Sequence, residues 1–402
     1  MGSASETPKE AEALKELSVD QLRPGMYVHD LGVPWVFHPF LYNRFFLDRQ
    51  SIDRLRKLGI QRIVVDTSHE QHDEKPAAPP TKDYAQSGTA QETDKHAGNQ
   101  VRAITKEARS FVKGMIEQAR AGQAIDHSDV EAVSDSLFSA VTSHRSTMFA
   151  FGRIRSRDNY TYQHCVNVSV LLMAFAEHIG MEHDHVRRIG TAGLLHDIGK
   201  ALIPEEIVKK PGKLTEAEYK IMKTHVRQGV AVLQDSDGIP PLAIELTATH
   251  HERMDGGGYP NGYDASKLSA ESRMIAMVDV YDALTAVRPY HNGSPPTQGL
   301  HFILNQAGHF DRQLCERFVR CVGVYPPGSL VRLSSNELAV VLNVKEGKSL
   351  LPVVRIVYDI KRDKMYHPPR VVDLAGSRAN LRIESYESPE RWPVPPELYL
   401  TN

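Results

Sequence analysis

Apolar residues recur every three or four positions over most of the middle of the chain, which is the period of an amphipathic helix. This pattern runs from Val101 to about Thr142 and again, repeatedly, from Tyr162 to about Cys321. Segments rich in Gly and Pro interrupt it: "KKPGKLT", "DSDGIPP", "MDGGGYPNGYD" and "RPYHNGSPP". The pattern predicts a helical bundle over residues 101–325.

Shorter apolar runs flank this block. On the N-terminal side, "LRPGMYVHDL" and "IQRIVVD" favour strands and "DRQSIDRLRKLG" favours a helix, so residues 1–67 are predicted to form a small α/β domain that is mainly β. Residues 68–100 are polar and contain proline, which is typical of a flexible linker. After "YPPGSL", the runs "LAVVLNV" and "VVRIVYDI" predict a β-hairpin appendage and tail over residues 326–402. The predicted fold class is mainly α.

The amino-acid composition argues against several classes of protein. The 402 residues are 41% hydrophobic and 24% charged with a net charge of −2, so we expect a globular protein that does not coat DNA. The three cysteines have no metal-type spacing and form no disulfide framework, which favours a reducing compartment. Neither a signal-peptide pattern nor an apolar run long enough to span a membrane occurs, so we expect a cytoplasmic protein.

Histidine is frequent, with 19 residues, and several histidines lie at notable places in the predicted helices. Five of them fall near helix starts, within a helix or at helix ends: His164, His196, His225, His250 and His251. Asp197 follows the second of these, and Asp279 and Asp282 lie inside the apolar segment "RMIAMVDVYDALTAV". A carboxylate within an apolar helix is costly unless it is paired or bound to a metal.

These side chains fit a pair of bridged divalent metal ions, for which imidazole suits iron, manganese or zinc. One site would use His164, His196, Asp197 and Asp279. The other would use His225, His250 and His251 and share Asp197. Two ions about 3.5–4 Å apart can deliver a bridging hydroxide to phosphorus and neutralise the charge that develops, so the set predicts a phosphoester hydrolase.

Taken singly, these residues have ordinary explanations. A lone histidine such as His164 or His225 is most often a packed core or surface residue. Lys200, one turn after His196, is most often a solvated lysine that counters the helix dipole. Only the combination favours a metal centre.

The motifs resemble those of the HD-GYP subgroup of the HD phosphohydrolase superfamily, whose members act on bacterial cyclic di-GMP. They read "NYTYQH", "LLHDIGK", "IPEEIVKKPGKLTEAE", "MKTHVRQG", "HHERMDGGGYPNG" and "MVDVYDALTAVRPY", in family order, over about residues 140–325. The segment "LRPGMYV" resembles a small domain of unknown function that often precedes HD-GYP domains. The resemblance implies a metal-dependent phosphodiesterase that hydrolyses cyclic di-GMP to pGpG, with GMP as a further product left open.

The resemblance also assigns roles to residues. The family's metal ligands fall on the seven residues of the two sites above, with Asp197 and Lys200 as the catalytic pair. Lys200, Tyr259 and Arg288 fall on positions that bind substrate. Glu252 and Asp282 fall on positions that orient the ligands.

Two positions depart from the family pattern. Tyr160 stands where members with three metals carry glutamate, so we expect two ions. His291 follows "RPY", where a basic residue is frequent, and predicts weaker or pH-dependent phosphate binding.

Three functions stay open at this stage. Hydrolysis of cyclic di-GMP is favoured by the complete ligand set and by Lys200. The alternatives are a signalling module that binds cyclic di-GMP or a partner such as a diguanylate cyclase with negligible catalysis, and an HD hydrolase for another nucleotide. The sequence leaves the native metal and the formation of a homodimer open.

Overall fold

The structure is a computed structural model of the chain. It describes residues 14–24, 26–30, 45–47, 52, 55–56, 62–67, 89–153, 160–210, 212–286, 294–306, 308–345, 347–377 and 381–400. These residues belong to two compact units, Met1–Ser87 and Gly88–Asn402.

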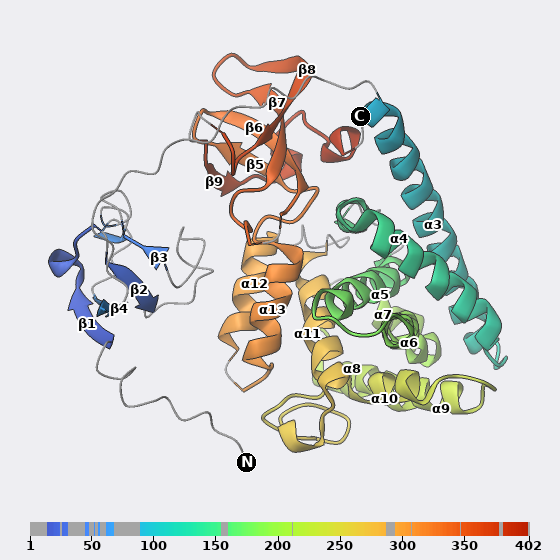
Figure 1. The fold of residues 1–402 in the computed structure, drawn as a ribbon. Coiled ribbons are helices and arrows are strands. Elements are labelled where there is room, and N and C mark those ends of the chain that lie inside the picture. The colour runs from blue at the N-terminus through green and yellow to red at the C-terminus, as the bar shows by residue number, and fades with distance from the viewer. Residues whose placement is uncertain are drawn as a thin grey trace. The chain divides into compact units, whose positions relative to one another are not determined.

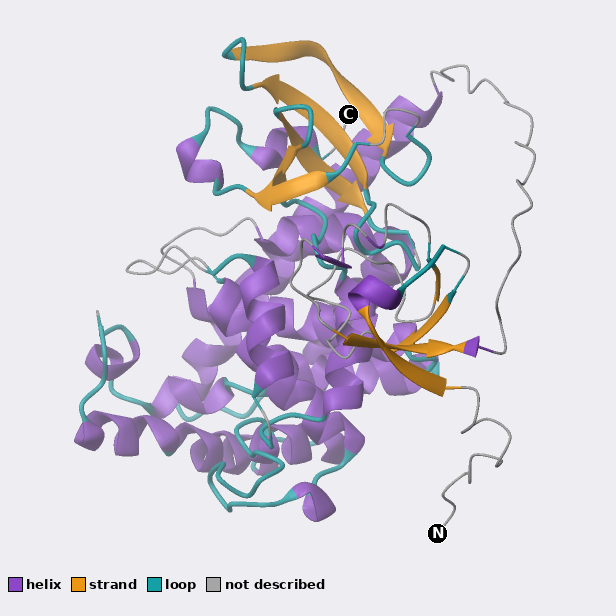
Figure 2. Cartoon of the chain, turned by 90° about the vertical axis from the view of Figure 1, so that its left-hand side faces the viewer, coloured by secondary structure: helices purple, strands orange, loops and turns teal. Residues whose placement is uncertain are grey.

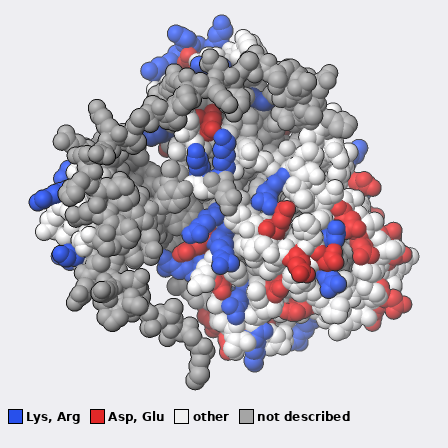
Figure 3. All heavy atoms as spheres, viewed as in Figure 1, with Lys and Arg blue, Asp and Glu red and all other residues white. Residues whose placement is uncertain are grey.

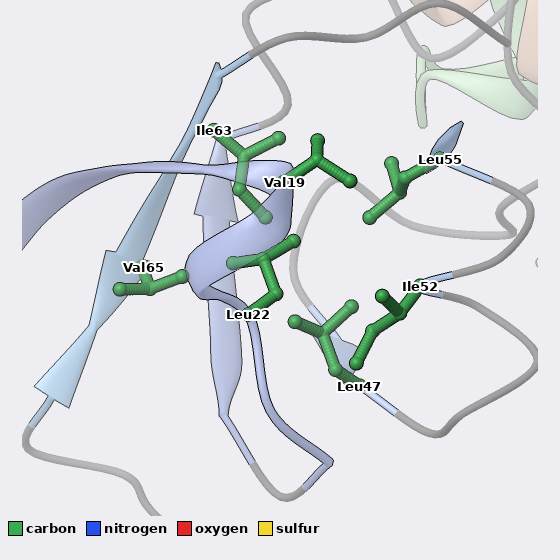
Figure 4. Close-up of a cluster of buried hydrophobic side chains, with 7 residues drawn as sticks. All are labelled: Val19, Leu22, Leu47, Ile52, Leu55, Ile63 and Val65. Carbon is green, nitrogen blue, oxygen red and sulfur yellow. The ribbon is translucent and has the colours of Figure 1, made fainter.

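The first unit contains a small antiparallel sheet, as the sequence predicts. Its strands are β1 (Leu14–Ser18), β2 (Tyr27–Asp30), β3 (Phe45–Phe46) and β4 (Arg62–Asp66), in the order β1-β4-β2-β3. Alternate residues of β4 point into a core of seven buried side chains (Figure 4): Val19, Leu22, Leu47, Ile52, Leu55, Ile63 and Val65. Of the helix expected at residues 48–59, only positions 52, 55 and 56 are described, and these are helical.

The second unit contains the predicted helical bundle, which confirms a mainly α fold (Figure 1). Its long helices are α3 (Thr89–Arg120), α4 (His127–Arg153), α5 (Tyr160–His178), α6 (His183–Leu195) and α11 (Ala270–Thr285). Shorter ones are the 3-10 helix η5 (Ile198–Leu202), α7 (Glu205–Val208), α8 (Glu216–Lys223), α9 (His225–Gln234), α10 (Pro241–Thr249), α12 (Pro296–Asn305) and α13 (Arg312–Val322).

Helix α3 begins earlier than the sequence predicts. Residues 89–100 were expected in the linker but are helical. The segment "TAQETDKHAGNQ" has few large apolar side chains, which is typical of a linker, yet Ala, Gln, Glu and Lys are good helix formers and extend the amphipathic helix that follows. The rest of the expected linker, residues 68–88, lies outside the described residues.

Helices α5 and α6 pack closely because α6 carries glycine where the two helices touch. A Cβ on Gly193 would lie 2.7 Å from the Cα of Ser169, so no larger residue fits there. The Ser169 hydroxyl also donates a hydrogen bond to the Gly190 carbonyl at 2.8 Å. This close approach brings His164 of α5 beside His196 at the end of α6, with their ring centroids 5.2 Å apart.

A five-stranded antiparallel sheet lies at one end of the bundle (Figures 1 and 2). Its strands are β5 (Leu330–Leu333), β6 (Glu337–Asn343), β7 (Val353–Asp359), β8 (Lys364–Asp373) and β9 (Ile383–Tyr386), in the order β8-β7-β6-β5-β9. Ser146 of α4 donates a hydrogen bond to Asn343 Oδ1 of β6 at 2.9 Å, which joins the sheet to the bundle. The predicted β appendage is therefore confirmed and is larger than a hairpin.

Strand β8 is not predicted from the sequence because it contains Pro368 and Pro369. Proline cannot donate a ladder hydrogen bond, so within sheets it is confined to edge strands and bulges. Both conditions hold here: β8 is an edge strand, and its pairing with β7 shifts register between Ile356 and Tyr358, opposite the two prolines.

The surface carries both signs of charge. On the face drawn in Figure 3, lysine and arginine lie among aspartate, glutamate and uncharged residues over the described part of the chain. This mixture differs from the one-sided basic face of a protein that coats nucleic acid. Within the described residues, no helix combines the length and the apolar character that a bilayer crossing requires.

Candidate metal centre

The predicted ligands come together inside the bundle from five places in the chain. His164 lies on α5, and His196 and Asp197 lie between α6 and η5. The others come from the start of α9, the end of α10 and the middle of α11: His225, His250, His251 and Asp279. All seven are buried except His251, which is partly exposed.

Three of the histidines sit just beyond a helix end, where the last turn leaves carbonyl groups without an intrahelical partner. In each, Nδ1 donates to the carbonyl three residues earlier: His196 to Gly193 at 2.8 Å, His225 to Met222 at 2.7 Å and His250 to Thr247 at 2.8 Å. A carbonyl oxygen can only accept, so Nδ1 carries the proton and Nε2 keeps its lone pair. Each ring therefore directs a ligand atom at the centre.

Two groups of ligand atoms are close enough to hold one ion each. His164, His196 and Asp279 form the first group, and His225, His250 and His251 form the second; within each group the ligand atoms lie within 4.8 Å of one another. In the first group, His164 Nε2 is 2.9 Å from Asp279 Oδ1. The sequence divides the histidines in the same way.

Asp197 faces both groups. Its Oδ2 lies 3.6 Å from His164 Nε2 and 3.5 Å from His196 Nε2. Its Oδ1 lies 3.5 Å from His225 Nε2 and 3.8 Å from His250 Nε2. One carboxylate therefore has an oxygen directed at each group, which is the arrangement that a bridging ligand requires.

Several buried polar atoms of the centre are left without a hydrogen bond among the described residues. His196 Nε2 and Asp197 Oδ1 have no partner, although buried polar atoms are nearly always paired. His225 Nε2 lies 3.2 Å from His250 Nε2, and both atoms carry lone pairs because both Nδ1 atoms carry the protons. Two lone pairs at this distance repel, and a cation between or beside them removes the repulsion. The residues present therefore fit metal ions.

The charge states of the side chains also suit metal binding. Burial lowers the pKa of His225 and of His250 to about 4 and lowers the pKa of His196, so the rings are neutral at pH 7. Burial by itself would raise the pKa of Asp197, but the Lys200 ammonium, 2.5 Å from Oδ2, and the neighbouring rings hold it well below its usual value. Neutral imidazole and ionised carboxylate are the forms that bind metal.

Asp282 holds the ring of His164, a member of the first group. Its Oδ2 lies 2.7 Å from His164 Nδ1, which fixes that ring with Nε2 directed at the centre. Asn167 donates to Asp282 Oδ1 at 3.4 Å and to the Gly152 carbonyl at 2.8 Å, so it ties this carboxylate to α4. Asn167 is not singled out by the sequence, although its place three residues after His164 puts both on one face of α5.

Glu252 holds the loop that follows α10. Its two carboxylate oxygens accept from the backbone N–H groups of Asn261 and Tyr263, at 2.7 and 3.0 Å. The loop in turn places the ring of Tyr259 against the ring of His251, with centroids 4.7 Å apart and planes inclined by 32°. Glu252 therefore positions the loop, whereas the resemblance assigned it to orienting ligands.

Three of the predicted residues are not covered, or not fully covered, by the described part of the structure. Arg288 and His291 fall outside the described residues, and so does the side chain of Tyr160, the first residue of α5. The role of each stays a prediction.

Two family models match this chain, and one curated relative matches nearly its whole length. The HD domain family matches residues 143–314, and the domain of unknown function DUF3391 matches residues 14–130. A cyclic di-GMP phosphodiesterase of Pseudomonas aeruginosa is 37% identical over 392 residues, which cover 94% of this chain and 93% of that protein.

Other relatives match a smaller part. A 3′3′-cGAMP-specific phosphodiesterase of Vibrio cholerae is 34% identical over 169 residues, 42% of this chain and 39% of that protein. Among solved structures, the HDG"Y"P protein Bd1817 from Bdellovibrio bacteriovorus is 15% identical, with a TM-score of 0.48, and covers 76% of this chain and 98% of that one. From the HD domain, the DUF3391 domain and the identity over nearly the whole length, the chain belongs to the HD-GYP family of phosphodiesterases.

Proposed function

We propose that this protein hydrolyses cyclic di-GMP to linear pGpG at a centre of two divalent metal ions. The observation that carries the proposal is Asp197, with one oxygen directed at each of two ligand groups. The relative that matches nearly the whole chain is named for cyclic di-GMP, which supports this substrate. Mixed imidazole and carboxylate ligands suit iron or manganese.

The ions, when bound, would neutralise charge on the substrate phosphate and lower the pKa of a water molecule that attacks phosphorus. The protein's own groups complete the site. Lys200 lies beside Asp197 with its side chain 22% exposed, so its ammonium can reach a phosphate oxygen that approaches the centre. We assign a second phosphate contact to Arg288 from the family motif. Tyr259 covers His251 and forms part of the wall beside the phosphate.

The variant Asp197→Ala tests this proposal. We expect loss of both ions, measured by elemental analysis after gel filtration, and loss of cyclic di-GMP turnover, measured by chromatographic separation of cyclic di-GMP, pGpG and GMP. Asp184→Ala is the matched control, because His183 and Asp184 form another His-Asp pair and the Asp184 side chain is 81% exposed. Full metal content and turnover in Asp197→Ala would refute the proposal.

A second candidate is hydrolysis of a different cyclic dinucleotide. It is favoured by the Vibrio cholerae relative, which is named for 3′3′-cGAMP. The same assay with both cyclic dinucleotides as competing substrates separates the two candidates. Faster consumption of cyclic di-GMP supports the first proposal, and faster consumption of 3′3′-cGAMP supports the second. Tight binding of either one without product would indicate a sensor.

A further inference from the structure

The metal centre opens to solvent on one side. The side chains of His251 and Lys200 are 23% and 22% exposed, whereas those of His164, His196, Asp197, His225, His250 and Asp279 are at most 8% exposed. Among the described residues of the centre, His251 and Lys200 therefore lie where a substrate phosphate would enter. What surrounds these two residues decides which molecule is admitted.

A row of aromatic rings leads outward from His251. The Tyr259 ring lies against the His251 ring, and the Tyr219 ring of α8 meets Tyr259 edge to face, with centroids 6.4 Å apart and planes at 80°. Tyr219 is thus two ring contacts from a metal ligand. It is 48% exposed, and no residue of α8 is buried, so core packing does not explain its place.

Lys223 fixes these rings. It follows Tyr219 by four residues, one turn along the same face of α8. Its ammonium nitrogen lies 5.0 Å from the centroid of the Tyr219 ring and 5.5 Å from that of the Tyr259 ring, so one cation joins both tyrosines. Both of these contacts are with rings and neither is with a carboxylate, so the charge of Lys223 stays available to an acceptor atom on a ligand.

We propose that Tyr219 and Lys223 form a nucleobase-binding shelf beside the metal centre. In this proposal, the exposed part of the Tyr219 ring stacks on the base of the nucleotide whose phosphate lies at the centre. Lys223 holds Tyr219 against Tyr259 and faces the acceptor atoms at the edge of that base. The inference rests on the proposed function, because it requires a nucleotide as the substrate, and it deepens that function by naming residues that recognise the base.

The test compares two ligands that differ only in the base. GMP carries a base and a phosphate, and ribose 5-phosphate carries the sugar phosphate alone. Calorimetry on the full chain loaded with manganese measures the Kd of each. Stacking of a base on an aromatic ring predicts that Tyr219→Ala weakens the binding of GMP about 5- to 150-fold and leaves the binding of ribose 5-phosphate unchanged. Lys223→Leu is expected to weaken GMP about 2- to 5-fold.

Two controls separate stacking from a general disturbance of α8. Tyr219→Phe keeps the ring and should retain the affinity for GMP. Ile221→Ala shortens another exposed apolar side chain of α8, 42% exposed, and should leave both Kd values unchanged. The shelf would be overturned if Tyr219→Ala weakened the binding of both ligands equally or of neither. It would also be overturned if the wild-type protein did not bind GMP more tightly than ribose 5-phosphate.

Failure of the shelf can be told apart from failure of the proposed function. If the wild-type chain turns over cyclic di-GMP and Tyr219→Ala does not raise KM, the shelf is overturned while the hydrolase stands. If no cyclic di-GMP is hydrolysed but Tyr219→Ala selectively weakens the binding of GMP, the shelf is supported and the proposed hydrolysis is refuted.

Discussion

Replacing Gly199 with alanine is expected to destabilise the helical unit and to displace His225, one of the proposed metal ligands. Gly199 lies in η5, two residues after Asp197, where η5 crosses α9. A Cβ at this position would lie 1.9 Å from the carbonyl oxygen of His225, 2.4 Å from the Gly229 nitrogen and 2.9 Å from the Gly229 Cα. All three are main-chain atoms, so no side-chain rotation can relieve the overlap.

The size of the effect follows from these distances. The His225 carbonyl would have to move from 1.9 Å to the 3.4 Å of an ordinary contact, a displacement of about 1.5 Å. Overpacking in a core costs about 1–3 kcal/mol, and we expect the upper end because the backbone of α9 must shift. For a unit that spans Gly88–Asn402, with an unfolding entropy of about 2.1 cal/mol/K per residue, about 3 kcal/mol lowers Tm by roughly 5 °C. The same shift carries the His225 ring away from Asp197 and weakens metal binding.

Scanning calorimetry of the metal-free protein measures the change in Tm, and titration with manganese measures the change in affinity. Gly114→Ala is the matched control, because Gly114 lies within helix α3 and a Cβ there meets nothing within 4 Å. That substitution should stabilise the protein by about 0.5–1 kcal/mol. If Gly199→Ala melts at or above the wild-type Tm and binds manganese normally, the close crossing of η5 and α9 is wrong.

Two further predictions concern residues around the ligands. Asp282→Ala removes the acceptor of the His164 ring proton and should lower metal affinity about 10–100-fold in competition with a chelating indicator; unchanged affinity would contradict its role. Glu252→Ala removes both acceptors of the Asn261 and Tyr263 amides and should cost about 1.5–3 kcal/mol of local stability. Hydrogen exchange at these two amides measures that loss, and wild-type protection there would argue against it.

The sequence predicts the bundle and the grouping of the ligands because both depend on local patterns. The helical period in the middle of the chain reports which faces are buried. A carboxylate such as Asp279 in an apolar helix already indicates a partner, since burying it alone is costly. The seven candidate ligands could therefore be selected without coordinates, and the structure brings them together.

Other features depend on neighbours that are distant in sequence. Asn167 is an ordinary polar residue until Gly152 and Asp282 are placed beside it. Strand β8 breaks the propensity rule for proline and is tolerated only because it lies at a sheet edge. Lys223 and Tyr219 are typical of an exposed helix face, and only the position of the Tyr259 ring relates them to the centre.

The hydrogen bonds from three histidine rings to carbonyls of their own preceding turns bear on how the protein matures. Because the preceding helix turn sets the orientation of each of these imidazole rings, the rings can be positioned without a bound ion. If the centre binds metal as proposed, the chain can fold first and acquire metal afterwards, and the bound ion would then depend on which ions are available and on their exchange.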